Sequence, residues 1–229
     1  MSEVVSPSEG LGVLHLFCKP TESSAGGVDG AAVVRAVEAA TAAEIQVISV
    51  EILGHKADLA FMALGPDWRA LRRFQSALQA AGLPVVDSYV SLTEISEYAA
   101  GVPDEMRNMR LYPELPPEDK PAWCFYPMSK RRNPGQNWFS TEFETRKKLM
   151  YEHGMSGRKF KGRVLQVITG STGIDDYEWG VTLFCQRPDD LKDVVYTMRF
   201  DEASAEFAEF GPFYAGSVVA LDELLELHG

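Results

Sequence analysis

The chain has 229 residues, enough for two fused halves of about 110 residues that each bury a core. Hydrophobic residues make up 45% of the sequence and charged residues 24%, as in ordinary globular proteins. The formal net charge of −11 argues against a nucleic-acid binder or a partner of acidic membranes, because such partners select for basic surfaces.

The first ten residues are predicted to be a loose tail. They have neither the basic start nor the apolar core of a signal peptide, and no later window approaches about 18 uninterrupted apolar residues. Cys18, Cys124 and Cys185 lie far apart without a CxxC pair, so neither a zinc ribbon nor a disulfide framework is indicated. We expect a cytoplasmic protein that does not span a membrane and keeps its thiols reduced.

Turn residues divide residues 1–100 into a regular series of elements. Pro66 and Asp67 open the second helix of the series, and Gly82 ends it. The predicted order is a strand at 11–18, a loop at 19–30, a helix at 31–43, strands at 45–53 and 57–64, a helix up to 82 and a strand at 85–92. This β-α-β-β-α-β order predicts a ferredoxin-like half.

Residues 101–120 are rich in Pro, Glu and Arg and are predicted to be a connector to a second half at 121–229. That half repeats the order, with a strand at 122–128, a helix at 140–153, strands at 162–169 and 178–186, a helix at 189–199 and a strand at 212–219. We predict an α+β fold in which two ferredoxin-like βαββαβ halves join their antiparallel sheets into one barrel with helices outside.

The segment from Tyr126 to Arg132 combines an oxidisable phenol with three cations, and His153 follows it. Residues 107–163 contain 13 Lys and Arg against 6 Asp and Glu. Such an excess is compatible with a solvated basic face or with a site for a small polyanion. Together, the phenol, the cations and the imidazole are typical of a redox site for an anionic ligand.

The helix before His153 begins in a polar run, Ser140 to Glu144, and is predicted to stop at Gly154, which places His153 on its last turn. A single histidine is often structural. No second histidine or carboxylate stands at the spacing of a zinc site, whereas one axial ligand to haem-type iron needs no companion.

Several long motifs follow one another along the connector and the second half. They are Arg110 to Pro116 (RLYPELP), Cys124 to Arg132 (CFYPMSKRR), Leu149 to Arg158 (LMYEHGMSGR), Thr169 to Phe184 (TGSTGIDDYEWGVTLF) and Met198 to Ala205 (MRFDEASA). In these motifs the sequence strongly resembles the coproheme decarboxylases of Gram-positive-type bacteria, which belong to the chlorite dismutase superfamily. The resemblance covers about residues 107 to 216; the first half matches more weakly.

The resemblance implies a cytoplasmic homopentamer that binds iron coproporphyrin III (coproheme) in the second half. With hydrogen peroxide, that family converts two of the four propionates into vinyl groups, releasing carbon dioxide and giving haem b. It also implies transient contact with the coproporphyrin ferrochelatase.

Carried over by position, the resemblance implies His153 as the iron ligand, Tyr126 as the catalytic tyrosine and Lys130 as a lysine that assists the second decarboxylation. Gln166 falls at the distal position and Met128 near the porphyrin. The residues that match propionate ligands are Arg110, Arg199 and Ser204.

The period of a β-strand fits these roles, because Tyr126, Met128 and Lys130 alternate and would share one face if the strand extends that far. Purely structural explanations of these residues stay open. Tyr126 before Pro127 also suits the end of a strand, and Gln166 suits a hydrogen-bonded surface position. The pair Asp175 and Asp176 is better explained as turn chemistry than as a metal site.

The sequence departs from relatives at Phe139, where many have Tyr, and at Met109, where one branch has a distal histidine. Two rival functions remain. A chlorite dismutase depends on a distal arginine, which Gln166 replaces here. A non-catalytic haem-binding or haem-sensing barrel would need His153 but not Tyr126.

Overall fold

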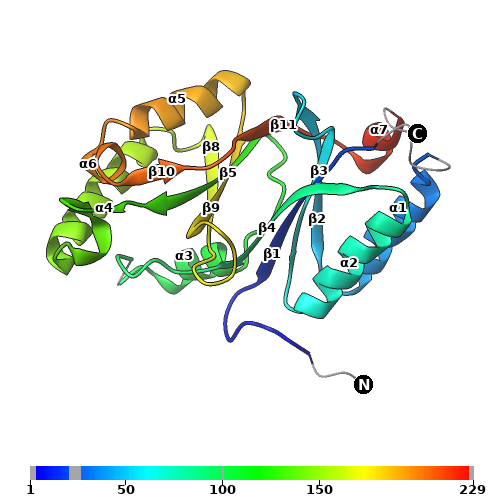
Figure 1. Cartoon of the computed structure of the whole chain (residues 1–229), viewed down its shortest axis with the longest axis horizontal. Helices are drawn as coiled ribbons and strands as arrows, with labels where there is room; N and C mark the ends of the chain where they lie inside the picture. Colours follow the sequence, from blue (N-terminus) through cyan, green and yellow to red (C-terminus); the bar gives the residue numbers. More distant parts are fainter. Residues whose placement is uncertain (1–3, 21–26, 100, 227–229) are drawn as a thin grey trace.

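The structure is a computed structural model that describes residues 4–20, 27–99 and 101–226 (Figure 1). Parts of the predicted tail and of the loop at 19–30 lie outside these residues. The helices are α1 (Gly30–Ala42), α2 (Trp68–Ala80), α3 (Asp104–Leu111), α4 (Phe143–Arg158), α5 (Pro188–Met198), α6 (Glu202–Ala205) and α7 (Leu221–Glu226). The strands are β1 (Gly12–Cys18), β2 (Gln46–Leu53), β3 (Leu59–Gly65), β4 (Val85–Thr93), β5 (Ala122–Lys130), β6 (Arg132–Asn133), β7 (Gln136–Asn137), β8 (Val164–Gly170), β9 (Trp179–Cys185), β10 (Ala208–Phe210) and β11 (Tyr214–Val218).

Eight strands form a closed antiparallel ring, which confirms the predicted α+β barrel. The order around the ring is β5, β11, β2, β3, β1, β4, β8, β9 and back to β5, with β10 paired along β5. The two halves meet at two seams, β11 with β2 and β4 with β8. Aromatic side chains fill the interior, where Phe17 stacks on Tyr214 at 3.7 Å between ring centroids.

Six helices lie in two groups at opposite ends of the molecule, α1, α2 and α7 at one end and α4, α5 and α6 at the other, while α3 lies between the groups (Figure 1). On the first half, α1 and α2 pack directly on the sheet through a large apolar cluster, which includes Phe61, Leu71 and Phe74. The C-terminal helix α7 joins this cluster through Leu224, so the chain returns to its first half at the end. Asp29 and Asp67 begin α1 and α2 by accepting backbone hydrogen bonds.

The second half is covered differently. Helix α4 has one buried residue, Leu149, and its main contacts are with α5 and α6. On β8 of this half, the outward-facing Ile168 is 47% exposed. Therefore α4 does not seal the sheet as α1 and α2 do, and an open face remains over β8.

Two predictions about helices were wrong. Helix α4 does not end at Gly154 but runs to Arg158, so His153 lies in its interior and not on its last turn. The contacts with α5 and α6 hold the helix across Gly154 and Gly157, because tertiary packing outweighs a glycine's cost of about 1 kcal/mol. The connector contains a helix, α3, which the Pro-rich composition did not reveal.

None of the described helices is long and apolar enough to cross a membrane.

Candidate functional site

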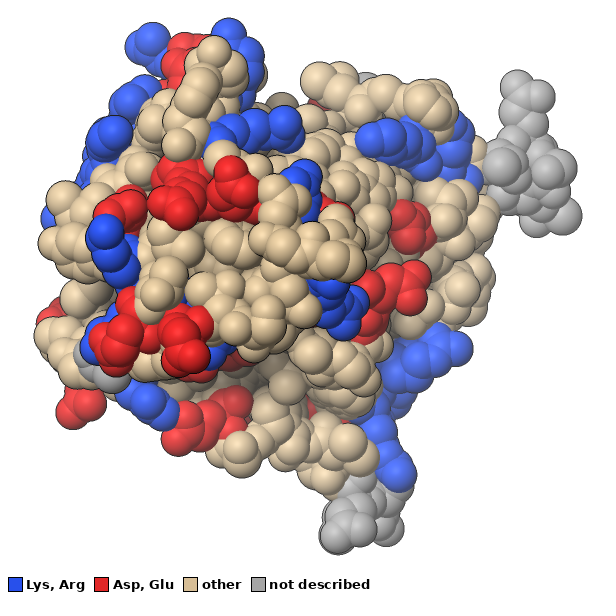
Figure 2. Space-filling view, turned by 60° about the vertical axis from the view of Figure 1, so that its left-hand side comes forward, with Lys and Arg blue, Asp and Glu red and all other residues tan. Residues whose placement is uncertain are grey.

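The predicted site residues gather on the outer face of the second half, around α4, α5, α6 and β5. Figure 2 brings this half forward and shows acidic and basic side chains intermingled on it. The excess of cations at 107–163 does not form one basic patch, because many of them pair with carboxylates. These pairs are Arg107 with Glu9, Lys120 with Asp119, Arg131 with Glu209, Arg132 with Glu178, Arg146 with Glu97, Lys147 with Glu144, Lys148 with Glu152 and Arg163 with Asp190.

His153 is held through one ring nitrogen. Its Nδ1 lies 3.0 Å and 3.1 Å from the two carboxylate oxygens of Asp201, and Ser204 Oγ is 3.4 Å away. Burial alone would raise the pKa of Asp201, but hydrogen bonds from His153 and Ser204 lower it below its usual value. An ionised carboxylate only accepts, so Nδ1 is the donor to Asp201, and in the neutral ring the lone pair lies on Nε2, where it can bind a ligand.

The backbone explains why Asp201 stands there. It is the N-cap of α6, and its carboxylate also accepts the backbone N–H of Ser204 at 3.0 Å. The side chain is 6% exposed. One carboxylate therefore both begins α6 and orients His153. Among the residues that the structure describes, Nε2 of His153 has no hydrogen-bond partner.

Lys130 ends β5, and its side chain is buried. Its Nζ donates to the Ala203 carbonyl oxygen at 2.6 Å and lies 4.5 Å from the centroid of the Trp138 ring. Its backbone N–H donates to Glu178 at 2.8 Å. Burial lowers the pKa of Lys130 to about 8, although Asp201 and Glu178 act in the opposite direction.

Tyr126 lies on the face of β5 that α5 covers, and the strand extends through Met128 to Lys130, as the alternation requires. Its ring stacks on Phe213 at 4.5 Å and meets Phe210 edge-on at 5.6 Å. Burial, with a smaller contribution from Cys124, raises the pKa of Tyr126, while Arg199 opposes that rise. The phenol therefore stays protonated at neutral pH.

Gln166 and Met128 border the same apolar cluster as Tyr126. Gln166 Nε2 donates to the sulfur of Met198 at 3.6 Å, and both methionines pack against the cluster. A Cβ added to Gly157 would lie 3.5 Å from Gln166 Nε2, so the C-terminal part of α4 lies close to Gln166 of β8. His153 is one turn earlier in α4, on the same face as Gly157.

The two predicted propionate arginines are placed differently. Arg199 ends α5, with its guanidinium 4.8 Å from the Phe210 ring centroid, so it lies beside the Tyr126 group. Arg110 is exposed on α3 and makes no hydrogen bond or ion pair with the other predicted residues in the described parts of the chain. The structure therefore brings together all the predicted residues except Arg110.

These residues combine an apolar cluster around Tyr126 with an imidazole whose Nε2 has no hydrogen-bond partner in the described parts of the chain. Exposed Ile168, two residues from Gln166 on the same face of β8, supplies an apolar wall. No three His, Cys, Asp or Glu side chains cluster as metal ligands within 4–20, 27–99 and 101–226. A porphyrin brings its own four nitrogen ligands to iron, so His153 is sufficient as the protein ligand.

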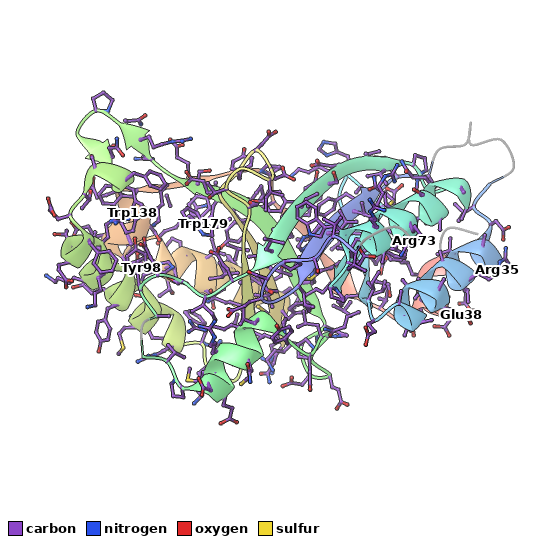
Figure 3. The ribbon with its side chains drawn as sticks, turned by 90° about the horizontal axis from the view of Figure 1, so that it is seen from below. Arg35, Glu38, Arg73, Tyr98, Trp138 and Trp179 are labelled. Atoms are coloured by element: carbon purple, nitrogen blue, oxygen red, sulfur yellow. The ribbon has the colours of Figure 1, made fainter. Side chains whose placement is uncertain are left out.

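Sequence reasoning missed Asp201 and Trp138. The run from Met198 to Ala205 contains an Asp before Glu-Ala-Ser, typical of a helix start, and that signal pointed to the N-cap but not to the histidine. Trp138 packs against Ala203 and Leu149 in a small cluster. Figure 3 labels Trp138 and also Tyr98, from the end of the first half, and the centroids of their rings lie 6.2 Å apart in an edge-on contact.

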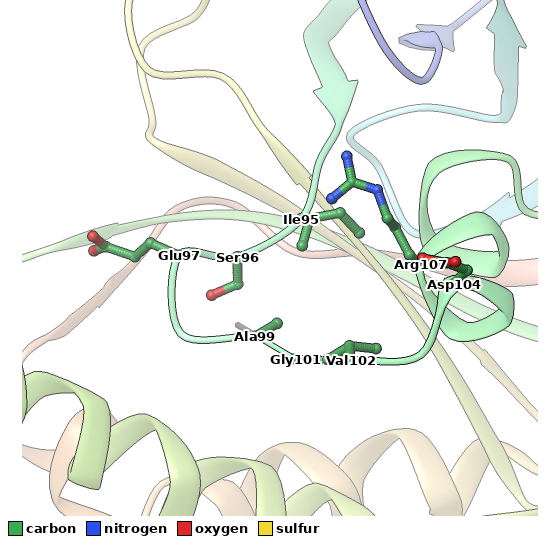
Figure 4. Close-up of a pocket in the computed structure, with 8 residues that line it drawn as sticks. All are labelled: Ile95, Ser96, Glu97, Ala99, Gly101, Val102, Asp104 and Arg107. Atoms are coloured by element: carbon green, nitrogen blue, oxygen red, sulfur yellow. The ribbon is translucent and has the colours of Figure 1, made fainter.

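A cavity of about 240 Å³ lies in the connector, at the start of α3 (Figure 4). None of the predicted site residues lines it. Its lining residues are Ile95, Ser96, Glu97, Ala99, Gly101, Val102, Asp104 and Arg107. Asp175 lies in the turn between β8 and β9, where its carboxylate accepts the Asp176 N–H at 2.8 Å, as expected of a turn residue, and also the Val90 N–H of β4 at 2.8 Å.

Known proteins share both sequence and fold with this chain. The chain is 49% identical over 185 residues to a coproheme decarboxylase of Staphylococcus carnosus (strain TM300), covering 76% of this chain and 73% of that protein. The structure of a haem-binding protein from Thermus thermophilus has a TM-score of 0.88 at 33% identity, covering 99% of this chain and all of that one.

A chlorite dismutase from Candidatus Nitrospira defluvii has the same fold, with a TM-score of 0.77 at 21% identity, covering 97% of this chain and 96% of that one. The chlorite dismutase family model matches residues 29–219, which include all the predicted site residues. The chain therefore belongs to the chlorite dismutase family.

Proposed function

We propose that this protein is a coproheme decarboxylase, which uses hydrogen peroxide to convert two propionates of iron coproporphyrin III into vinyl groups and so gives haem b. The observation that carries the proposal is that β5 presents Tyr126 and Lys130 on the face covered by the helices that hold His153. The 49% identity to the Staphylococcus carnosus coproheme decarboxylase supports it.

The proposed roles follow the chemistry of each side chain. His153 binds the iron through Nε2, while Asp201 keeps the proton on Nδ1. Arg199, Ser204 and Arg110 receive propionate carboxylates, and Arg110 requires α3 or the ligand to approach for this. Met128 and Gln166 border the porphyrin.

The bound iron porphyrin supplies the redox chemistry with peroxide. Each decarboxylation removes two electrons from a propionate, which loses carbon dioxide and leaves a vinyl group, and one peroxide takes those electrons and becomes two waters. Tyr126 would first lose its own hydrogen atom in an oxidation that the bound iron porphyrin and peroxide would supply, and its radical would then take a hydrogen atom from the propionate side chain. Burial raises the pKa of Tyr126, so the phenol holds its proton until that oxidation. Lys130 assists the second decarboxylation.

The test is to load the protein with ferric coproheme, titrate hydrogen peroxide and follow the porphyrin by mass spectrometry. Loss of two carboxyl groups per porphyrin supports the proposal. Binding without conversion would leave a haem-binding protein, and oxygen evolution from chlorite would favour the chlorite dismutase activity instead. The replacement of a distal arginine by Gln166 disfavours that last outcome.

His153→Ala is predicted to abolish the absorption bands of histidine-ligated iron and to weaken retention of the porphyrin, because Nε2 is the proposed iron ligand. Absorption spectroscopy and gel filtration of the loaded protein measure both effects. His55→Ala, in a turn of the first half, is the matched control. An unchanged spectrum in His153→Ala would show that another residue binds the iron.

We also propose that the chain acts as a cytoplasmic homopentamer, with transient contact to the coproporphyrin ferrochelatase. Residues 1–100 and 121–229 form its two halves, with 101–120 as the connector. Sedimentation equilibrium tests the assembly, since a pentamer has five times the 25.3 kDa of one chain. A monomer or dimer at all concentrations would refute it.

A further inference from the structure

Lys130 has a position that direct contact with a ligand does not explain. Its ammonium is seated between the Trp138 ring, 4.5 Å away, and the Ala203 carbonyl oxygen, 2.6 Å away. The Lys130 residue is 7% exposed. A buried ammonium is costly unless it is paired, and an aromatic face together with a carbonyl oxygen provides partners. The side chain is therefore fixed against α6.

Helix α6 needs such support. It has four residues, too few to be stable alone, and its place depends on contacts with the rest of the half. Ala203 is fully buried in a cluster with Trp138 and Leu149. Leu149 belongs to α4, one turn before His153, so this cluster joins α6 to the helix that carries the histidine.

The two ends of α6 carry the groups that hold His153. Asp201 precedes the helix and Ser204 is its third residue, and both lie within hydrogen-bond distance of Nδ1. Ala203 lies between them in the chain. A shift of α6 away from Lys130 would therefore move the carboxylate that fixes the imidazole.

We propose that Lys130 and Trp138 are positioning residues for His153. The ammonium, seated on the Trp138 ring, fixes α6 through the Ala203 carbonyl, and α6 in turn holds Asp201 against Nδ1. The inference rests on the proposed role of His153 as the iron ligand, but it concerns contacts that exist without the porphyrin. It gives Lys130 a structural task on the histidine side in addition to any role toward a propionate.

The test measures the imidazole of His153 directly in the porphyrin-free protein, by NMR of ¹⁵N-labelled histidine. Lys130→Met and Trp138→Phe are each expected to lower the ratio of Nδ1–H to Nε2–H tautomer on the order of tenfold, since each weakens a charge-assisted contact. Lys148→Met, an exposed lysine of α4, is the matched control and leaves the ratio unchanged. Asp201→Ala removes the carboxylate and so gives the tautomer ratio expected when the hydrogen bond at Nδ1 is lost completely.

A second readout uses the iron-loaded protein. Resonance Raman spectroscopy of the ferrous form is expected to show the iron–histidine stretching band shifted to lower frequency in Lys130→Met and Trp138→Phe, because a weaker hydrogen bond at Nδ1 makes Nε2 a poorer donor. Trp138→Phe keeps an aromatic ring at the position and serves if Lys130→Met fails to fold.

Unchanged tautomer ratios in both variants would overturn the positioning role, whatever their activity. A wild-type histidine without the Nδ1 proton would overturn it as well. A protein that shifts its tautomer ratio as expected but does not decarboxylate coproheme would retain the positioning role and lose the proposed function.

Discussion

Lys130 carries a buried charge whose cost depends on pH. Burial lowers its pKa in the folded protein from 10.5 to about 8, and the opposing influence of Asp201 and Glu178 does not compensate. Below about pH 8 both the folded and the unfolded chain hold the proton, and the folded protein bears the full cost of the charge. Above that pH the folded chain releases the proton first.

Stability relative to Lys130→Met is therefore predicted to rise with pH between about 8 and 10.5, since the unfolded chain binds more protons across that window. The rise is at most about 3 kcal/mol. Urea unfolding at several pH values measures it, with Lys148→Met in place of Lys130→Met as the control comparison. A difference that does not vary with pH would contradict the assignment.

At the same scale, the sequence signals the candidate site residues more clearly than their contact partners. Tyr126, Lys130 and His153 are distinctive types in long motifs, and alternation along one strand correctly predicted that Tyr126 and Lys130 share a face. The partners of these groups come from elsewhere in the fold. Asp201 meets His153 across 48 positions, and Ala203 offers a backbone carbonyl, which no side-chain pattern signals.

Helix α4 shows how the elements depart from local signals. Gly154 is a natural helix end in sequence, yet the helix continues for four residues because α5 and α6 pack against it. A Cβ at Gly154 would meet no atom within 4 Å. Gly154 therefore lowers the intrinsic stability of α4, and the tertiary contacts of the helix compensate for this cost.

Gly154→Ala is predicted to increase the free energy of unfolding by about 0.5–1 kcal/mol, since alanine loses less backbone freedom in a helix. Urea unfolding of the porphyrin-free protein measures the change. A loss of stability would show that Gly154 does not have helical geometry.

The strand β11 joins the two halves through β2, and Gly216 permits that pairing. A Cβ at Gly216 would lie 1.9 Å from the Glu51 carbonyl oxygen, closer than any real contact. Gly216→Ala is therefore predicted to destabilise the protein by about 3 kcal/mol or more. Gly30→Ala, whose Cβ makes an ordinary contact at 3.7 Å, is the control for thermal unfolding. Equal melting temperatures of Gly216→Ala and Gly30→Ala would contradict the close approach of β11 to β2 at Gly216.

At the scale of the whole molecule, the ring has two halves with unequal helical cover. The order of elements predicted the barrel, because two β-α-β-β-α-β series leave sheet edges that must pair. It did not predict that α1 and α2 seal one half while Ile168 of β8 stays exposed in the other. That difference depends on side-chain packing between elements far apart in sequence, and it confines the proposed site to the second half.

The central claim is that Tyr126 decarboxylates coproheme bound through His153. The most direct measurement compares wild type, Tyr126→Phe and Tyr196→Phe, each loaded with ferric coproheme and titrated with hydrogen peroxide, by mass spectrometry of the porphyrin. Tyr196 is exposed on α5 and provides the matched control. Loss of two carboxyl groups in wild type and Tyr196→Phe, with none in Tyr126→Phe, is the predicted result. Equal conversion in all three proteins would contradict the account.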